Sequence, residues 1–396
     1  MSPNRSSNSP LNIVFASHTV MGGTFVVGSH HLAREMAMLG HRVLHLSSPV
    51  SLAHLLCVNR TDYKVRCAVW FRGGVIHNNL VADYVPLSLF PWVIAKRFLR
   101  FGMNPLLLTV PSLRRIARRF KFSKVDILLV DEPRFLGIER ILKPRILVYR
   151  ATDLYSAMKG DDSIGVAEQQ LAECVDGLVA TSEPVLDHLK KMAPEKPSLL
   201  LDNGVDYDRF SRPIDAHPIL SKISCPRVVY TGALDGRFDF EAVGNLAQCL
   251  PDVQILLVGP CTDAASRIAA DCPNIHLSGP MPYEEIPSLL HGAGLALLPF
   301  SSHPANAGRS PMKLYEYAAA GLPVVARHTP ELARRAEPFV HFYRTADELV
   351  AVVRDLLNAP TNSTEIQQRA RLQSWHTKSE ALLGFALSVK AIRLDN

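Results

Sequence analysis

The sequence predicts an α/β protein built from two doubly wound, Rossmann-like domains that face each other across a cleft. Three observations predict this fold class. The chain has 396 residues, more than one hydrophobic core usually supports. Short apolar runs typical of buried parallel strands alternate with helical patterns and glycine turns. The alternation restarts after a stretch rich in proline and polar residues. We therefore expect domains over residues 1–206 and 225–375, a linker over 207–224, and a closing helix over 376–396 able to return to the first domain.

The first half opens with a strand, a glycine-containing loop, a helix and a second strand. The loop, residues 18–28, lacks the full GxGxxG spacing, so it does not indicate a dinucleotide site. Ligands of open α/β sheets gather at the carboxyl ends of strands, which makes Asp131, Arg150 and Asp153 candidates by position. The strands expected in this half cover residues 11–17, 41–47, 127–131, 146–150, 177–182 and 199–201, and the helices cover 29–40, 164–174 and a segment from 183.

The second half repeats this order of elements. We expect strands over residues 227–233, 253–258, 275–280, 294–300 and 324–326, and helices over 240–249, 284–291, 311–320, 366–375 and 378–392. Clefts between domains are favoured ligand sites, so the cleft is where we expect a ligand.

One stretch, SPMKLYEYAAAGLPVVA over residues 310–326, has a chemical peculiarity. It reads as a helix that ends at Gly321, followed by a buried strand. Lys313 stands in the first helical turn, where the helix dipole disfavours a cation. An anion such as a diphosphate, shared by the lysine and the helix N-terminus, would remove this conflict. The alternative is a solvated pair of Lys313 and Glu316 on the helix surface.

Basic residues are unevenly distributed. The net charge is +6, and no acidic residue occurs between Asp83 and Asp126, where nine lysines and arginines are interleaved with apolar residues. Such segments suit the surface of an anionic membrane. Nucleic acid is a rival partner, but no nucleic-acid module is recognisable, and ordinary helices with basic outer faces remain an alternative. The residues expected to face a membrane are Trp92, Lys96, Arg97, Arg100, Arg114, Arg115, Arg118 and Arg119.

Other features exclude several classes of protein. No apolar run approaches the roughly 18 residues of a membrane-spanning helix, and the polar start MSPNRSSNSP does not resemble a secretory signal. Seven cysteines without CxxC spacing, mostly in apolar or strand-like contexts, indicate reduced thiols rather than disulfides or a zinc site. The pair Asp161 and Asp162 reads as a solvated turn, so we expect no metal. These features predict a cytoplasmic protein, peripheral on the inner face of the cytoplasmic membrane.

Several segments resemble one known family. They are SHHLAREMAMLGH, VYRATDLYSA, LVATSEPVLDHL, LLDNGVDYDRF, VVYTGAL, LLVGP and SPMKLYEYAAAGLPVVA. In this order they resemble nucleotide-sugar glycosyltransferases of GT-B architecture, of the bacterial kind that extends lipid-linked exopolysaccharide or cell-wall precursors, such as the membrane-associated glucuronosyltransferases of xanthan synthesis and the teichuronic-acid transferases. The combination NGVDxxxF with YEYxAxGxPVV is the more specific part.

The resemblance implies roles at matching positions. The second domain would bind the donor, with Lys313 and Met312 at the diphosphate and Glu316 at the ribose hydroxyls. A tight turn at Gly232 and Ala233 would face the phosphates. The remaining donor residues would be Gly259, Met281, Tyr283 and Ser310. On the acceptor side the resemblance and the strand ends together give His18, Gly23, His30, His31, Arg150 and Tyr155.

The reaction implied is transfer of a sugar, glucuronic acid or glucose, from a UDP-sugar to a lipid-linked or polysaccharide-precursor acceptor. Asp153 matches the general base of the inverting members, and an acceptor hydroxyl needs such a carboxylate. Retaining members carry two glutamates separated by seven residues. If Glu316 is the second, Gly308 stands in place of the first, which favours inversion. We expect no cofactor other than the nucleotide-sugar substrate and no nucleic-acid partner.

Three alternatives remain open. They are a nucleotide-sugar epimerase on the same fold, a non-catalytic nucleotide-sugar-binding subunit of an assembly complex, and a less favoured NAD(P)-dependent enzyme. The sequence leaves open the sugar, the acceptor and its linkage, the stereochemistry, uracil against guanine, and the oligomeric state.

Overall fold

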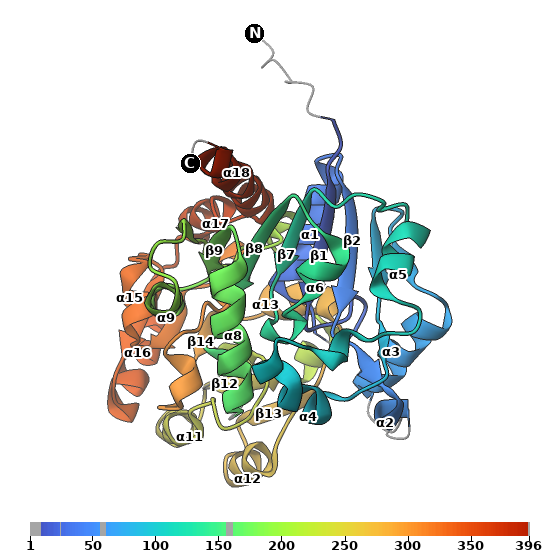
Figure 1. The fold of residues 1–396 in the computed structure, drawn as a ribbon. Coiled ribbons are helices and arrows are strands. Elements are labelled where there is room, and N and C mark those ends of the chain that lie inside the picture. Colours follow the sequence, from blue (N-terminus) through green and yellow to red (C-terminus); the bar gives the residue numbers. More distant parts are fainter. Residues whose placement is uncertain (1–8, 24, 56–60, 156–160, 395–396) are drawn as a thin grey trace. The chain divides into compact units, whose positions relative to one another are not determined.

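The computed structural model describes residues 9–23, 25–55, 61–155 and 161–394. The chain forms two compact units (Figure 1). Unit 1 comprises Met1–Thr181, Val185–Leu201 and Lys378–Asn396, and unit 2 comprises Ser182–Pro184 and Asp202–Thr377. Most of the closing helix α18 (Trp375–Leu394) thus belongs to unit 1.

The segment 207–224, expected as a linker, is instead part of unit 2. It forms helix α10 (Tyr207–Ser211) and the 3-10 helix η4 (Pro218–Lys222). Phe210 and Leu220 are buried in the hydrophobic core of unit 2. The polar and proline residues that suggested a linker therefore lie between apolar side chains that anchor the segment.

Unit 1 contains an eight-stranded sheet in the order β10-β9-β8-β7-β1-β2-β5-β4, in which β4 and β5 pair antiparallel and the other neighbours pair parallel. The strand order reverses between β1 and β7, which makes their carboxyl ends the expected place for a ligand. The strands are β1 (Asn12–Ser17), β2 (Arg42–Ser47), β4 (Val75–His77), β5 (Val81–Tyr84), β7 (Ile127–Val130), β8 (Ile146–Ala151), β9 (Gly177–Ala180) and β10 (Ser198–Leu200).

The helices of unit 1 surround this sheet, and β3 (Val50–Ser51) pairs with β6 (Leu87–Ser88) in a small second sheet. The residues between β2 and β7, for which the sequence predicted almost no element, are largely ordered into short pieces. The helices are α1 (Gly28–Met38), α2 (Leu52–Leu55), α3 (Thr61–Phe71), α4 (Trp92–Ala95), η1 (Lys96–Phe101), η2 (Pro105–Leu107), α5 (Leu113–Arg119), η3 (Pro133–Phe135), α6 (Ile138–Leu142), α8 (Asp162–Cys174) and α9 (Glu183–Met192).

Unit 2 contains a six-stranded parallel sheet in the order β13-β12-β11-β14-β15-β16. The strand order reverses between β11 and β14. Its strands are β11 (Arg227–Thr231), β12 (Gln254–Val258), β13 (Ile275–Gly279), β14 (Leu295–Leu298), β15 (Val324–Arg327) and β16 (Val340–Tyr343). Its other helices are α11 (Phe240–Cys249), α12 (Asp263–Asp271), η5 (Tyr283–Glu285), α13 (Ile286–Leu290), η6 (Pro304–Asn306), α14 (Lys313–Ala319), α15 (Pro330–Arg334), α16 (Ala346–Asn358) and α17 (Ser363–Arg371).

Both sheets are covered on their two faces. In unit 2 one cluster of buried side chains packs α13, α14 and α17 against the sheet, and a second packs α11, α12 and α16 against the other face. Strands buried on both faces explain why the sequence shows continuous apolar runs rather than alternation. Within the described ranges, no helix combines the length and the apolar character needed to cross a bilayer.

The described cysteines are free thiols, but their surroundings differ from the prediction. Only Cys67 and Cys272 are buried, whereas Cys174, Cys225, Cys249 and Cys261 are exposed. Apolar neighbours in the sequence did not imply burial, because Cys174 and Cys249 are the last residues of α8 and α11 and Cys225 and Cys261 lie in loops. Cys57 lies outside the described residues.

Candidate functional site

The helix that carries Lys313 is shorter than predicted. It begins at Lys313 rather than at Pro311, with Met312 as the residue before it, and Gly321 follows with a left-handed backbone at φ 81°. At seven residues, α14 has a small dipole. Recognition of an anion here must therefore come from side chains and from the adjacent turns.

Two glycine turns meet beside Lys313. Gly232 follows β11 and Gly259 follows β12, and the Gly232 amide donates to the Val258 carbonyl at 2.7 Å. A Cβ on Gly259 would lie 1.9 Å from the Gly232 carbonyl oxygen, and a Cβ on Gly232 would lie 2.8 Å from Lys313 Cε. Both positions therefore require glycine for close approach. This packing holds the lysine against the carboxyl ends of the strands.

The charge of Lys313 is poorly compensated by the protein. Its side chain is half-buried, and burial lowers its pKa; Glu316 opposes this effect, while Arg309 and Arg237 add to it. Among the described residues, none places a carboxylate oxygen within ion-pair distance of the ammonium. A bound anion would supply the missing counter-charge.

Glu316 lies one helical turn away and is itself buried. Burial raises the pKa of its carboxyl group, and Tyr283 donates a hydrogen bond to Oε1 at 3.2 Å. The Tyr283 ring packs edge-on against Phe210, and the Arg209 guanidinium lies 5.5 Å from the ring centre. Glu316 is thus no solvated surface residue, and the predicted alternative of an exposed Lys–Glu pair is wrong because α14 is buried against the sheet.

The other predicted donor residues differ in position. The Ala233 carbonyl accepts a hydrogen bond from Tyr230, and Met281 packs against the core. Met312 is half-exposed just before α14. Ser310 is buried, and its hydroxyl accepts from the Asn203 amide at 3.1 Å and the Arg335 guanidinium at 2.8 Å. Its partners give Ser310 a role in holding the loop before α14.

Sequence reasoning missed two cations beside this site. Arg237 lies in the loop after Gly232 and binds Asp235 through two nitrogens at 2.9 and 2.6 Å. Arg309 stacks on the Phe300 ring at 5.4 Å. Both act electrostatically on Lys313. A sequence signal existed for Arg237, which follows the predicted glycine turn by five residues.

Asp153 follows β8 in unit 1 and is half-exposed. The Thr152 hydroxyl lies 3.4 Å from Asp153 Oδ2 and 2.8 Å from the Tyr155 hydroxyl. Tyr155 is buried and also donates to the Asp131 carbonyl. The strand end therefore positions Asp153 through its neighbours and leaves the carboxylate reachable.

Arg150 and Asp131 form a buried ion pair at 3.0 Å rather than an open surface. Both are about 1% exposed. Burial raises the pKa of Asp131, although Arg150 opposes this effect. These two residues link the ends of β7 and β8, so the structure gives Arg150 and Tyr155 supporting positions beneath Asp153.

The predicted acceptor-side histidines also lie mostly inside. His30 and His31 are buried in the first turns of α1, and His30 contacts the Thr19 carbonyl at 3.1 Å. Burial and the neighbouring His45 hold the pKa of His30 well below its usual value. His18 and Gly23, both half-buried, lie in the loop between β1 and α1. Of this set, only His18 and Gly23 are accessible.

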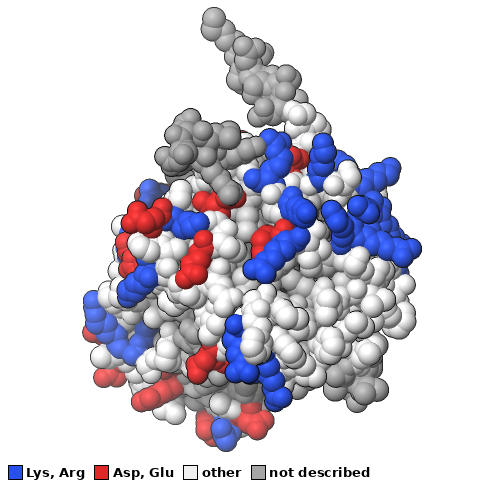
Figure 2. Space-filling view, viewed as in Figure 1, with Lys and Arg blue, Asp and Glu red and all other residues white. Residues whose placement is uncertain are grey.

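The residues expected to face a membrane divide into two groups. Trp92 packs against the core and its indole donates to Asp161 at 3.2 Å, and Lys96 pairs with Asp161 at the same distance. Figure 2 shows basic side chains gathered over α5. The exposed members of the set are Arg97, Arg100, Arg114, Arg115, Arg118 and Arg119.

No group of three or more metal-binding side chains occurs in the part of the chain that the structure describes. The polar atoms at the ends of β11 and β12 and at α14 form instead a site of cationic and carboxylate side chains, with room for close backbone approach. Such a set suits a phosphate-containing ligand with hydroxyl groups.

Comparisons with known proteins agree with this chemistry. Residues 240–381 match the model of the family described as glycosyl transferase-like. Over 253 residues the chain is 25% identical to a putative teichuronic acid biosynthesis glycosyltransferase of Bacillus subtilis. That match covers 58% of this chain and 64% of the relative, which is less than two thirds of the relative's length.

Solved structures resemble almost the whole chain. A glycosyltransferase of Rickettsia africae is 16% identical with a TM-score of 0.64, over 96% of this chain and 99% of its own. The Anabaena protein HepE, solved with UDP and glucose, is 15% identical with a TM-score of 0.69, over 96% and 100%. A putative UDP-N-acetylglucosamine 2-epimerase of Listeria monocytogenes is 13% identical with a TM-score of 0.55, over 94% and 95%. The chain therefore has the α/β fold of the GT-B glycosyltransferases, as predicted, and over residues 240–381 it is similar in sequence to the glycosyl transferase-like family.

Proposed function

We propose that the protein is a glycosyltransferase that takes a sugar from a nucleoside diphosphate sugar. The observation that carries this proposal is the half-buried ammonium of Lys313, held against the Gly232 and Gly259 turns without a carboxylate partner among the described residues. A diphosphate would compensate this charge, because charge-assisted hydrogen bonds to phosphate are strong. Glu316, hydrogen-bonded by Tyr283, is placed to accept hydrogen bonds from ribose hydroxyls.

We favour UDP as the nucleotide, with glucuronic acid or glucose as the sugar. The complex of HepE with UDP and glucose supports UDP through similarity of fold. The Bacillus relative supports a cell-envelope acceptor, either lipid-linked or a polysaccharide precursor.

Asp153 is the proposed general base of an inverting transfer. The acceptor hydroxyl oxygen bonds to the anomeric carbon as the bond from that carbon to the diphosphate breaks. The hydroxyl proton moves to Asp153, and UDP leaves with the electron pair. Lys313, with Arg237 and Arg309 nearby, stabilises the charge that develops on the leaving diphosphate.

The protein would act as a peripheral protein on the inner face of the cytoplasmic membrane. Six arginines of η1 and α5 are exposed. Apolar side chains on the same stretch are also exposed, among them Val93 and Phe101, both at 63%, and Met103 at 56%. A mixture of basic and apolar side chains suits the interface of an anionic bilayer.

The test is replacement of Asp153→Asn, measured by transfer from UDP-[14C]glucose or UDP-[14C]glucuronic acid to a membrane lipid extract. We expect transfer to fall at least about 100-fold, the usual contribution of a general base, while UDP binding is kept. Asp187→Asn, an exposed carboxylate of α9, is the matched control. Near-normal turnover in Asp153→Asn would refute the base assignment.

Omitting the acceptor separates a transferase from an epimerase. A transferase consumes donor only when acceptor is present, apart from slow hydrolysis. An epimerase of the kind suggested by the Listeria neighbour converts the donor alone, and a binding subunit retains UDP without turnover.

A further inference from the structure

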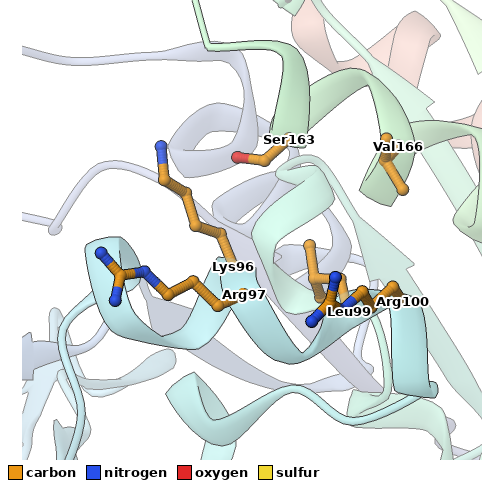
Figure 3. A pocket seen from close by; sticks show the side chains of 6 residues that line it. All are labelled: Lys96, Arg97, Leu99, Arg100, Ser163 and Val166. Carbon is orange, nitrogen blue, oxygen red and sulfur yellow. The ribbon is translucent and has the colours of Figure 1, made fainter.

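Two pockets of different chemistry lie along one face of α8 in unit 1. The first, of about 350 Å³, is lined by Lys96, Arg97, Leu99, Arg100, Ser163 and Val166. Figure 3 shows the four η1 residues on one wall and the two α8 residues on the other. This pocket combines three cationic side chains with an apolar floor at Leu99, which is buried.

The second pocket, of about 210 Å³, lies further along α8, beside the segment that follows η1. Its walls include Met103, Leu107 and Leu108 from the segment after η1, Leu136 and Ile141 from the region of α6, and Gln170 from α8. It is mainly apolar, and its cation, Arg140, donates to the Gly102 carbonyl at 3.1 Å.

The spacing on α8 relates the two pockets. Ser163 and Val166 line the first pocket and Gln170 lines the second. Residues three and four apart share one face of a helix. At a rise of 1.5 Å per residue, the seven steps from Ser163 to Gln170 place these two residues about 10 Å apart along α8. A cationic pocket and an apolar pocket thus lie close enough along α8 for one ligand molecule to contact both.

Two of the three cations in the first pocket are available to bind an anionic ligand. Asp161 already pairs with Lys96 at 3.2 Å, and the Ser163 hydroxyl, followed by the Lys96 ammonium and the Trp92 indole, lowers the pKa of Asp161 to about 2. Arg97 and Arg100 are exposed, and no carboxylate of the described chain lies within ion-pair distance of either. Arg100 stacks on the Phe101 ring, at 4.7 Å.

We propose that these pockets bind a lipid phosphate or diphosphate, with the phosphate against Arg97 and Arg100 and the first part of the hydrocarbon chain against Met103, Leu107 and Leu108. Guanidinium groups bind phosphate oxygens through parallel hydrogen bonds. An amphiphile accounts for both pockets and for the exposed Val93, Phe98 and Phe101 beside them. Its significance as the anchor of a lipid-linked acceptor rests on the proposed function, whereas the binding itself does not.

The test measures binding of farnesyl diphosphate by isothermal titration calorimetry, with inorganic diphosphate and farnesol as comparison ligands. It uses the full chain carrying Lys313→Met, so that the proposed donor site does not compete. We expect farnesyl diphosphate to bind more tightly than either comparison ligand. Arg97→Gln with Arg100→Gln should weaken it by roughly tenfold or more, since two charge-assisted contacts are lost.

Four further variants make the result specific. Arg114→Gln with Arg115→Gln removes the same charge from exposed positions of α5 and should leave binding unchanged. Arg97→Lys with Arg100→Lys should restore part of it. Met103→Asp should weaken farnesyl diphosphate but not inorganic diphosphate, whereas Phe71→Asp, at a more exposed position, should change neither.

The proposal is overturned if the α5 pair weakens binding as much as the η1 pair, because the attraction is then general charge. Equal affinity for inorganic and farnesyl diphosphate overturns the lipid assignment, and absence of binding overturns both parts. Farnesyl diphosphate binding in a protein that does not bind UDP would refute the proposed function while supporting this inference.

Discussion

Replacing Lys313 by methionine separates the charge of this side chain from its packing. Methionine keeps most of the length and fills the space beside Gly232, where a Cβ would lie 2.8 Å from Lys313 Cε. The substitution removes only the ammonium. If that ammonium binds the donor diphosphate, the variant should lose UDP affinity without losing the fold.

The magnitude follows from the burial of the site. Two unit charges 4 Å apart attract by about 4 kcal/mol at an effective dielectric constant of 20. Loss of one hydrogen bond to a charged group costs a smaller net amount, about 1.5–3 kcal/mol. At about 1.4 kcal/mol per tenfold, we expect UDP to bind about 10- to 150-fold more weakly. Burial lowers the pKa of Lys313, so the ligand-free protein carries an uncompensated charge, and the variant should melt at the same or a higher temperature.

The assay is calorimetric titration of UDP together with thermal unfolding with and without UDP. Lys222→Met, at an exposed lysine of η4 in the same unit, is the control and should leave both quantities unchanged. An affinity for UDP within twofold of the wild type in Lys313→Met, at normal stability, would show that the ammonium is not at the phosphates. A drop in the melting temperature of the ligand-free variant would show that Lys313 has a counter-charge in the protein.

Three further predictions concern the glycine turns, the buried glutamate and the basic surface. Gly259→Ala should destabilise unit 2 by about 1–3 kcal/mol and lower the affinity for UDP, because its Cβ would lie 1.9 Å from the Gly232 carbonyl oxygen. Gly236→Ala, with open space around it, is the control. It should change neither the melting temperature nor the UDP affinity measured by titration. Burial raises the pKa of Glu316, so its carboxylate becomes protonated at a higher pH than that of an ordinary glutamate. UDP affinity should therefore fall as the pH is lowered through that raised pKa. The same series of titrations with Glu316→Gln should lack this fall. The last prediction concerns the four arginines of α5, which are Arg114, Arg115, Arg118 and Arg119. Neutralising them together should weaken binding to phosphatidylglycerol vesicles by about 1 kcal/mol per arginine without affecting UDP affinity. Unchanged sedimentation with vesicles would contradict the membrane proposal.

Most strands of the two large sheets could be predicted because they are buried on two faces, but β4, β5 and β16 were missed. The runs at β7 and β14 are apolar at every position, and β12 is apolar after Gln254. A signal of that kind is local. Residues 48–125 gave no comparable signal. Their strands have two to four residues, and β4 is half-exposed with Ile76 pointing outward at 60% exposure. Short elements of this kind are fixed by contacts with distant parts of the chain, which periodicity does not register.

Part of the candidate donor site could also be predicted from the sequence. Lys313 stood out because a lysine at the start of a helix conflicts with a local rule, whereas Gly232 was assigned to the phosphates through the family resemblance. Arg309 carried no local conflict. It stands only four residues before Lys313, but its stacking on Phe300 and its electrostatic effect on Lys313 became visible only in the structure.

The histidines show where sequence reasoning about unit 1 failed. His30 seemed available to an acceptor because it follows a glycine-containing loop, but α1 begins at Gly28 and directs it into the interior. There His45 lies edge-on to it at 5.1 Å and pairs with Asp83 at 2.9 Å, so partners from β2 and β5 complete the cluster. His45 and His77 hold the pKa of Asp83 below its usual value although burial opposes this.

The charged side chains of unit 1 therefore fall into two groups, buried and exposed, and only the exposed group is available to ligands. Charges inside the unit have partners, as in the pairs Arg150–Asp131 and His45–Asp83. The exposed arginines of η1 and α5 lie in a stretch without acidic residues, and within the described residues they have no carboxylate at ion-pair distance. An unpaired cation at the surface costs little in folding, so its attraction remains available for binding. Anionic partners of unit 1 should consequently be recognised by exposed arginines of η1 or of α5 rather than by the buried histidines, and salt should weaken that recognition.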